Sequence, residues 1–499
     1  MISIMKNKNI FIALCSVALL SFTACSEDTF DDINKDNQHP APESVPAYLQ
    51  LTEAIMNTGY SAVSGDYSFY VSSLTEQEIG AGNNQLMKAE LRNPIEWAGS
   101  TTFNNAWNSI YGNLNNILQM QEKIENEVSG NVGHYDILAM AQILEALNFG
   151  ILTDMHGDIP YSEACKGLEN LQPKLDAQKD VYAGILATLD EAIANLDKAK
   201  AEKLENAGNQ DILFKGNLDQ WKGLAYGLKA RYLLHKLAIE PAVLADVKAA
   251  AQKAVELGFK GALINEFNGS TAFNPWTAYF ISRYYTLSST TVADMMKANK
   301  DPRLSFYTYD LDAYKPGDQF AAQISTPYDK DYNVVCSYPM WLDLGSQPIH
   351  VFSISELYFI LAEAQLRTGE DATEAFQTAV KNSVVEVYGF FGEDGNAAAD
   401  EYVATLGKPT LQTLFEQKYL AQCVDEQVET YNDLRRLEAM GESYINLTNP
   451  NNTQSGVNRF PYRLPYANSS VLANPSIKEA YGDGYYIYSE KVWWAGGNR

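Results

Sequence analysis

The fold is decided by residues 353–388, which read SISELYFILAEAQLRTGEDATEAFQTAVKNSVVEVY. Apolar residues recur at helical spacing on both sides of Thr368-Gly369, and a glycine at that place is typical of a helix end. Small residues such as Ala362 and Ala379 lie in both halves, where two antiparallel helices must approach closely. We therefore predict a hairpin of two helices, over residues 353–367 and 371–388.

A second pair with the same character spans residues 221–237 and 243–257, separated by Glu240-Pro241. Both pairs look like degenerate tetratricopeptide units, but no strict period is present, and a generic αα-hairpin explains the spacing equally well. Further helices are predicted around Trp107 and over residues 135–149, 181–196, 411–422 and 426–440. The predicted fold class is therefore predominantly all-α, with tetratricopeptide-like helical hairpins.

Two long segments, residues 259–350 and 441–492, lack this periodicity and are rich in Gly, Pro, Asn, Asp and aromatic residues. Long irregular insertions on a rigid helical body are where binding surfaces are usually found. We predict that these insertions form an irregular, loop-rich ligand-binding half within a single domain over residues 46–499.

The N-terminus has the pattern of an export signal. Lys6 and Lys8 precede a short apolar run over residues 10–22, which ends in Thr23-Ala24-Cys25. This run is too short for a membrane span and fits a secretory signal. A cysteine directly after a small residue is typical of a lipoprotein signal, although an ordinary secretory peptide is the alternative. We predict a lipoprotein signal peptide over residues 1–24, acylation of Cys25, and an acidic, Pro-containing tether over residues 25–45.

Composition excludes several classes of function. The formal net charge is −25, and removal of residues 1–24 would delete two lysines and no acid. Such an acidic surface repels phosphate backbones, so no nucleic acid is predicted as a partner. Besides Cys15 and Cys25, the sequence contains Cys165, Cys336 and Cys423, which allow at most one disulfide. The five histidines are scattered, so neither a metal site nor a cofactor is predicted.

Seven motifs follow one another in order along nearly the whole chain. They are DINKD (residues 32–36), DMHGDIPYSEA (154–164), DPRL (301–304), Ser355-Glu356 with LAEA (361–364), QKYLA (417–421), Arg435-Arg436, and RFPY (459–462) with Asn474-Pro475. In this set the sequence resembles the SusD-like (SusD/RagB) nutrient-binding outer-membrane lipoproteins. The resemblance implies an α-helical fold with four tetratricopeptide-like units that support an irregular ligand-binding half.

The same resemblance implies a partner and a location. The partner is a SusC-like, TonB-dependent outer-membrane transporter, over which the lipoprotein sits as a lid. The acidic residues that follow Cys25 resemble the stretch that directs some lipoproteins to the outer face of the cell. The expected location is therefore the outer membrane, with the protein held through its lipid anchor and facing the exterior.

The motifs themselves fit structural roles. Residues 154–164 contain Gly157 and Pro160 and are interpreted as a shaped turn after a long helix. Arg435-Arg436 stand late in a predicted helix, where they can pair with buried carboxylates, and Glu363 is a candidate partner.

The sequence contains few of the motifs that are typical of enzyme active sites. The D-x-H of residues 154–156 also occurs in metal-dependent phosphoesterases, but the later His235 and His350 have no matching ligand pattern. Neither a nucleophile elbow nor a phosphate-binding loop is present. We predict a protein that is not an enzyme, and a pure protein-interaction scaffold is a further alternative.

An oligosaccharide is the predicted ligand, with peptides or another nutrient as the alternative on the same scaffold. Sugars are gripped by aromatic platforms with polar side chains around them. Trp107 and Trp221 fit helix cores and Trp493-Trp494 fit packing of the C-terminal segment, which leaves the tryptophans of the irregular stretches. Trp276 is the first choice. The predicted contact residues are Trp276, Tyr279, Arg283, Tyr284, Trp97, Trp341 and Tyr70.

Overall fold

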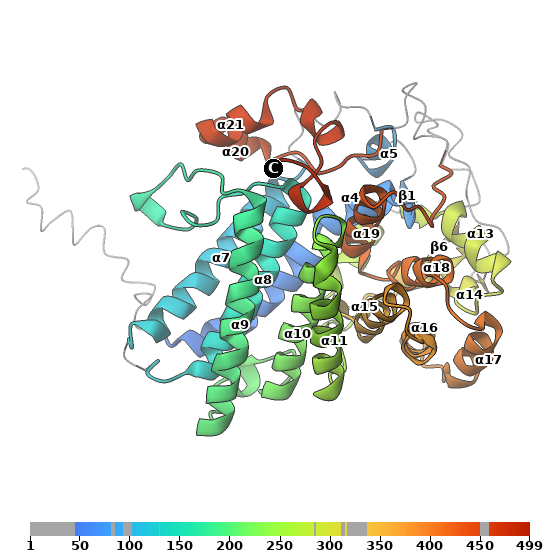
Figure 1. The fold of residues 1–499 in the computed structure, drawn as a ribbon, viewed down its shortest axis with the longest axis horizontal. Helices are drawn as coiled ribbons and strands as arrows, with labels where there is room; N and C mark the ends of the chain where they lie inside the picture. Colours follow the sequence, from blue (N-terminus) through green and yellow to red (C-terminus); the bar gives the residue numbers. More distant parts are fainter. Residues whose placement is uncertain are drawn as a thin grey trace, which may run out of the picture.

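The structure is a computed structural model that describes residues 45–80, 85–92, 102–128, 130–283, 286–310, 315–316, 337–449 and 459–499, drawn in colour in Figure 1. Helices dominate it, as predicted, and strands are few and short. The predicted signal peptide with Cys25, and the tether up to residue 44, lie outside the described residues.

A row of helices forms the larger part of the molecule (Figure 1). Its members are α7 (Asn104–Glu125), α8 (Tyr135–His156), α9 (Gln178–Glu202), α10 (Leu218–His235), α11 (Leu244–Glu256), α15 (Ile354–Arg367), α16 (Thr373–Phe390) and α17 (Asn396–Leu406). Each packs against the next in this order. The two hairpins predicted from the sequence are α10/α11 and α15/α16, and α8/α9 is a third pair.

The deciding hairpin forms as its sequence predicts. Ser353 caps α15 by accepting a hydrogen bond from the backbone N–H of Glu356, which satisfies one of the free donors of the first turn. The helix ends at Arg367, and Gly369 has φ +76°, a conformation that favours glycine. Ala362 and Ala379 are fully buried.

Helix α8 is longer than the predicted helix over residues 135–149. It ends at His156, so the first three residues of the 154–164 motif belong to its last turn. Gly157 then leaves the helix with φ +83°, where an added Cβ would lie 2.6 Å from Nη1 of Arg463. Among the described helices, α8 alone is long and apolar enough to span a membrane, but its most apolar window is entirely buried, as in the core helix of a globular body.

The loop-rich half contains more regular structure than predicted. Residues 259–350 include α12 (Pro275–Arg283), α13 (Thr290–Ala298), α14 (Leu304–Tyr307), the 3₁₀ turn η8 (Met340–Asp343) and strands β2 (Ala262–Ile264), β3 (Thr286–Ser288), β4 (Tyr309–Asp310), β5 (Lys315–Pro316), β6 (Ser337–Tyr338) and β7 (Ile349–Phe352). Elements this short leave too little periodicity to predict.

The strands connect distant parts of the chain. β1 (Glu78–Gly80) pairs antiparallel with β3, placing Ile79 opposite Leu287, and β2 pairs antiparallel with β7, placing Ile264 opposite Ile349. The third sheet has the order β5-β4-β6. The remaining N-terminal helices are the π-helix η3 (Thr58–Val63), α3 (Leu51–Asn57), α4 (Asp66–Leu74) and α5 (Gln85–Glu90).

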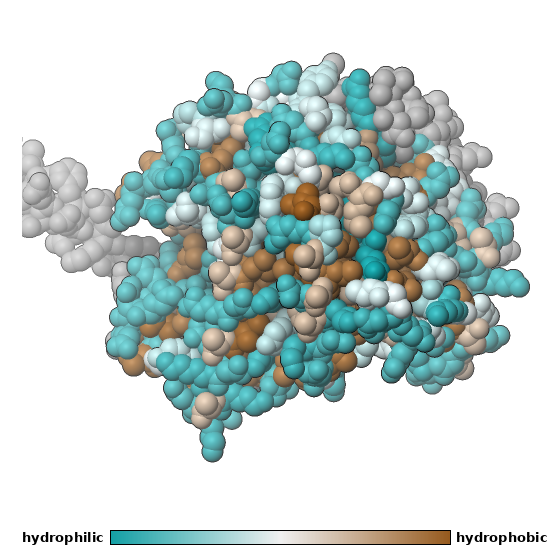
Figure 2. Space-filling model, viewed as in Figure 1, coloured by the Kyte–Doolittle hydropathy of each residue, from teal (hydrophilic) through white to brown (hydrophobic). Residues whose placement is uncertain are grey.

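Helix α19 (Gln427–Ala439) joins the two halves. It packs against α4 on one side and contacts α10 on the other, and Figure 1 shows it between the helical row and the irregular upper part. It follows α18 (Leu411–Ala421) and precedes the C-terminal elements α20 (Asn468–Ala473), α21 (Pro475–Tyr481), η10 (Tyr485–Tyr488) and η11 (Trp493–Ala495). The buried apolar side chains form one continuous core from Ala47 to Ala495, and the face in Figure 2 is covered mainly by hydrophilic residues, with apolar ones scattered over the helical row.

Candidate functional site

The structure places two of the three predicted tryptophans in the core. Trp276 lies in α12 and Trp341 in η8, and each is only 1% exposed. The ring of Trp276 meets Phe69 edge-on at 4.7 Å between centroids, and Trp341 packs against Tyr307 at 5.9 Å. Stacking on a sugar requires an exposed ring face, which neither ring presents in this conformation, so the predicted contacts of Trp276 and Trp341 stay predictions. Their surroundings are helical, which the irregular sequence concealed.

Of the other predicted contacts, Tyr279 lies near Trp276, since both rings pack on Phe69. Tyr70 is buried in α4, and its hydroxyl donates to Oε1 of Gln85 at 3.1 Å. Tyr279 is partly exposed, and one of its faces stacks on Phe69 at 4.5 Å. Arg283 is the last residue of α12. Tyr284 and Trp97 lie outside the described residues, so their predicted roles stay predictions.

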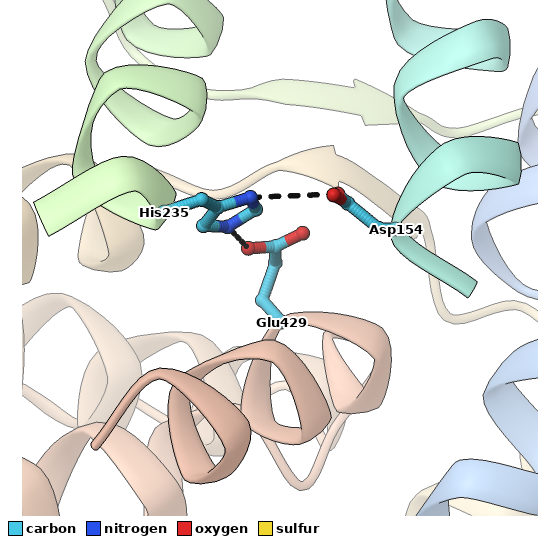
Figure 3. A group of neighbouring side chains, drawn as sticks. All are labelled: Asp154, His235 and Glu429. Carbon is cyan, nitrogen blue, oxygen red and sulfur yellow. Dashed lines mark hydrogen bonds and ion pairs between the residues drawn. The ribbon is translucent and has the colours of Figure 1, made fainter. Parts of the chain in front are cut away.

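A buried polar cluster lies beside α19, where His235 stands between two carboxylates (Figure 3). Nε2 of His235 is 2.9 Å from Oε2 of Glu429, and its Nδ1 is 3.4 Å from Oδ2 of Asp154. The hydroxyl of Tyr182 donates to Asp154, whose Oδ1 also accepts from Nε1 of Trp494 at 3.0 Å. All members come from different helices, so the cluster ties α8, α9, α10 and α19 together.

The donor atoms of Asp154, His235 and Glu429 lie within 4.8 Å of one another, which raises the question of a metal site. A metal-bound histidine is neutral, with one ring nitrogen on the ion and the other donating outward. Here each nitrogen faces a different carboxylate. Burial alone would lower the pKa of His235, but the charges of Asp154 and Glu429 raise it to about 9. In this arrangement the imidazole stands between the two acids and contacts both.

The histidine of the 154–164 motif is no better suited to metal chemistry. His156 is fully buried; its Nε2 is 2.6 Å from the hydroxyl of Tyr67, and its Nδ1 is 3.2 Å from the carbonyl oxygen of Leu464. Burial lowers the pKa of His156 to about 3. The residue joins α8 to α4 and to the C-terminal segment, which agrees with the structural interpretation of the motif.

A cavity of about 450 Å³ opens beside the C-terminal end of α19. Its volume falls in the range of small-molecule sites. Its wall combines aromatic rings with charged and apolar side chains from distant parts of the sequence. The lining residues are Arg92, Leu434, Arg435, Leu437, Glu438, Glu442, Ser443, Tyr444, Ile445, Leu447, Arg459, Phe460, Tyr462 and Tyr488.

Neighbouring side chains pack against the aromatic rings of the cavity. Tyr444 stacks on Phe415 with centroids 5.1 Å apart and planes only 4° from parallel. Phe460 has the guanidinium carbon of Arg92 5.2 Å from its centroid. Fixed aromatic faces of this kind are suited to the apolar C–H faces of a sugar. Within the described part of the chain, the buried hydroxyl of Tyr488 has no hydrogen-bond partner.

Two buried carboxylates position one wall of this cavity. Glu76 accepts hydrogen bonds from the backbone N–H groups of Thr448 at 2.8 Å and Asn449 at 2.9 Å. Glu90 accepts from the side-chain amide of Asn449 at 2.7 Å. The segment that carries Tyr444 and Leu447 is thereby attached to the α4–α5 region.

Sequence reasoning missed the residues of this cavity. It assigned RFPY, which contains Arg459, Phe460 and Tyr462, to the fold. It interpreted Trp493-Trp494, which follow Tyr488 closely in the sequence, as packing of the C-terminal segment. The available signal was the recurrence of aromatic residues with arginine inside the irregular segment 441–492, which had itself been predicted to bind.

Residues 64–467 match a protein-family model, SusD-like, which is described as starch-binding and associating with the outer membrane. The match covers most of the sequence. The chain belongs to the SusD-like family. A search of curated protein sequences finds no match.

Solved structures of SusD-like proteins share this fold. A SusD/RagB family protein from Bacteroides thetaiotaomicron VPI-5482 is 32% identical, with a TM-score of 0.80 over 91% of this chain and 100% of that one. A chitin-binding protein is 22% identical, with a TM-score of 0.69 over 90% and 100% of the two chains. A chitin-binding SusD homologue from Flavobacterium johnsoniae is 19% identical, with a TM-score of 0.68 over 89% and 98%.

Proposed function

We propose that this SusD-like protein is a cell-surface lipoprotein that binds a nutrient oligosaccharide in the cavity beside α19 and delivers it to a SusC-like, TonB-dependent outer-membrane transporter. The observation that carries the proposal is the composition of the cavity wall. Four aromatic rings, Tyr444, Phe460, Tyr462 and Tyr488, stand among charged side chains in a space of about 450 Å³. Flat apolar surfaces with hydrogen-bonding groups around them are what a sugar chain requires.

The relatives support a glycan as the ligand class. The family description names starch, and two structurally similar proteins are named for binding chitin. Capture without turnover fits the buried histidines, because His156 and His235 are both engaged with protein groups. The partly exposed Tyr279 and the predicted contacts Trp97, Arg283 and Tyr284 are proposed as further contacts for a longer chain.

The anchor and the partner are part of the same proposal. Acylation of Cys25 would hold the protein at the outer membrane through more than one acyl chain, which is a stable attachment. Delivery is tested by co-purification of the transporter with the full-length protein from outer membranes. A Cys25→Ala protein should be released from the membrane fraction and should lose the transporter.

Binding is tested by calorimetric titration of residues 26–499 with neutral and acidic oligosaccharides and with short peptides. Saturable binding of one sugar class that is weakened by Tyr444→Ala supports the proposal. Tyr60 is an exposed tyrosine that does not line the cavity, and Tyr60→Ala is the matched control. Binding of peptides and of no sugar would instead establish the second candidate, peptide capture, on the same scaffold.

A further inference from the structure

The cavity wall carries an excess of arginine in a protein of net charge −25. Three arginines, Arg92, Arg435 and Arg459, line it, together with two acids, Glu438 and Glu442. A neutral sugar needs no such excess, because its hydroxyl groups are served equally well by Asn, Gln or Ser side chains.

The two acids are already neutralised by cations that do not line the cavity. Glu442 accepts two hydrogen bonds from the Arg367 guanidinium, with Nη1 at 2.9 Å from Oε1 and Nη2 at 2.7 Å from Oε2. Glu438 pairs with Nζ of Lys491 at 2.5 Å. Neither carboxylate is therefore left to balance Arg459. Arg92 is not counted in this excess, because it lies near the buried carboxylates of Glu76 and Glu90.

Arg435 keeps its charge without a hydrogen-bonded carboxylate. Its Nη1 donates to the backbone carbonyl oxygens of Asp154 and Tyr462, both at 2.8 Å, and its Nη2 donates to the side-chain oxygen of Asn432. The guanidinium is 1% exposed and lies over the ring of Tyr431 at 4.0 Å. Because most of its N–H donors are engaged with protein oxygens, its contribution to the cavity is positive potential.

Arg459 is the arginine that can reach a ligand. It is partly exposed at the start of the RFPY segment. Within the residues that the structure describes, no hydrogen bond or ion pair engages its side chain. A guanidinium is a planar fork of donors that matches carboxylate and sulfate in a bidentate geometry.

We propose that the glycan bound in this cavity is anionic and that Arg459 binds its carboxylate or sulfate group, with Arg435 supplying positive potential from behind. The inference rests on the proposed function of the cavity and specifies the substrate class. The shared chemistry is an oxyanion on a sugar ring, from either a uronic acid or a sulfate ester.

The experiment compares matched ligands that differ only in charge. Residues 26–499 are titrated with oligogalacturonides and with their methyl esters, and with heparin-derived fragments before and after desulfation. Binding of the charged member at least 10-fold tighter in one of the two pairs is expected, and the pair that responds identifies the source of the oxyanion. The preference should weaken as salt rises.

Variants then assign the preference to Arg459. Arg459→Gln should lower affinity for the charged ligand about 10- to 100-fold, the usual effect of losing a charge-assisted hydrogen bond, and should leave the neutral analogue within 2-fold. Arg459→Lys should recover part of the affinity. Lys179, an exposed residue of α9, provides Lys179→Gln as a control that removes one positive charge elsewhere.

The outcomes separate the two proposals. Equal binding of charged and neutral sugars, weakened by Tyr444→Ala, would overturn the anionic class and leave glycan binding standing. An unchanged charge preference in Arg459→Gln would overturn the role of Arg459. Binding of peptides alone, or of no sugar from any panel, would overturn both.

Discussion

Glu363 on α15 and Arg436 on α19 form a bidentate ion pair in the core, with Nη1 at 2.7 Å from Oε1 and Nη2 at 2.8 Å from Oε2. Both side chains are at most 1% exposed. Arg436 also holds Asp433 at 2.8 Å, and Arg367 adds a second cation to Glu363 at 2.7 Å. Two helices separated by more than fifty residues in sequence are thereby held in one register.

Removing Glu363 should destabilise the fold strongly, because two buried or nearly buried arginines would each lose one of their two carboxylate partners. We expect Glu363→Ala to lower the free energy of unfolding by about 3–5 kcal/mol, measured by urea denaturation. Glu256→Gln, which breaks the exposed pair of Lys253 and Glu256, should leave the midpoint unchanged. An unchanged midpoint in Glu363→Ala would show that the pair only specifies geometry.

Stability should fall as pH rises from neutral to mildly alkaline. The pKa of His235 is about 9 in the fold, against 6.5 for an unperturbed histidine. The stabilisation from its protonated form is therefore complete below about pH 6.5 and is lost as pH rises through about 9. The stabilisation that is lost is on the order of 3 kcal/mol.

Chemical denaturation at a series of pH values between 6 and 9.5 measures the slope of the free energy of unfolding against pH. His350 has its pKa raised to about 9 as well; burial opposes this shift, and Glu386 is the main cause of it. His235→Gln should therefore flatten the slope in part, and the double variant with His350→Gln should flatten it further. A slope that is identical in all three proteins would contradict the assignment of charge to these rings.

Tyr444 is expected to carry a large share of sugar affinity, since its ring is held parallel to Phe415 and lines the cavity. Tyr444→Ala should weaken binding about 10-fold and Tyr444→Phe less than 3-fold. Calorimetry gives both affinities, and far-ultraviolet circular dichroism checks that each variant is folded. Equal losses in the two variants would indicate a hydroxyl contact in place of stacking.

Substitutions of Trp276 distinguish a role in the stability of the fold from a role in contact with the sugar. Because the residue is buried against Phe69, Trp276→Ala should cost about 3–5 kcal/mol of stability. Trp276→Phe retains an aromatic ring and should keep sugar affinity within 2-fold. A large loss of affinity in a stably folded Trp276→Phe protein would support the role predicted from the sequence.

The helical body was predictable because its helices are long enough to show their period. The α15/α16 hairpin and the partnership of Glu363 with an arginine of α19 followed from spacing and motif. The helices α12 to α14 have nine residues or fewer, so their periodicity is too short to read. That is why Trp276 was predicted to lie in an irregular stretch and to face a ligand.

The cavity could not be predicted from any local pattern in the sequence. Its wall is assembled from the second residue after α5, the end of α19, two parts of the irregular segment and the last residue of η10, which brings Arg92 and Tyr488 to one place. No window of the sequence contains this combination. Only the composition of residues 441–492 indicated that binding residues were present.

The bond between Asp154 and Trp494 joins residues 340 positions apart, and it has a consequence for how the chain reaches its native state. A chain is made from its N-terminus, so α8, with almost every residue shielded in the finished protein, exists for most of synthesis without its final cover. Contacts of such long range slow folding. The last steps of folding therefore wait for the segment that carries Trp494, and a chain shortened before Trp494 should remain aggregation-prone and need chaperones while it persists.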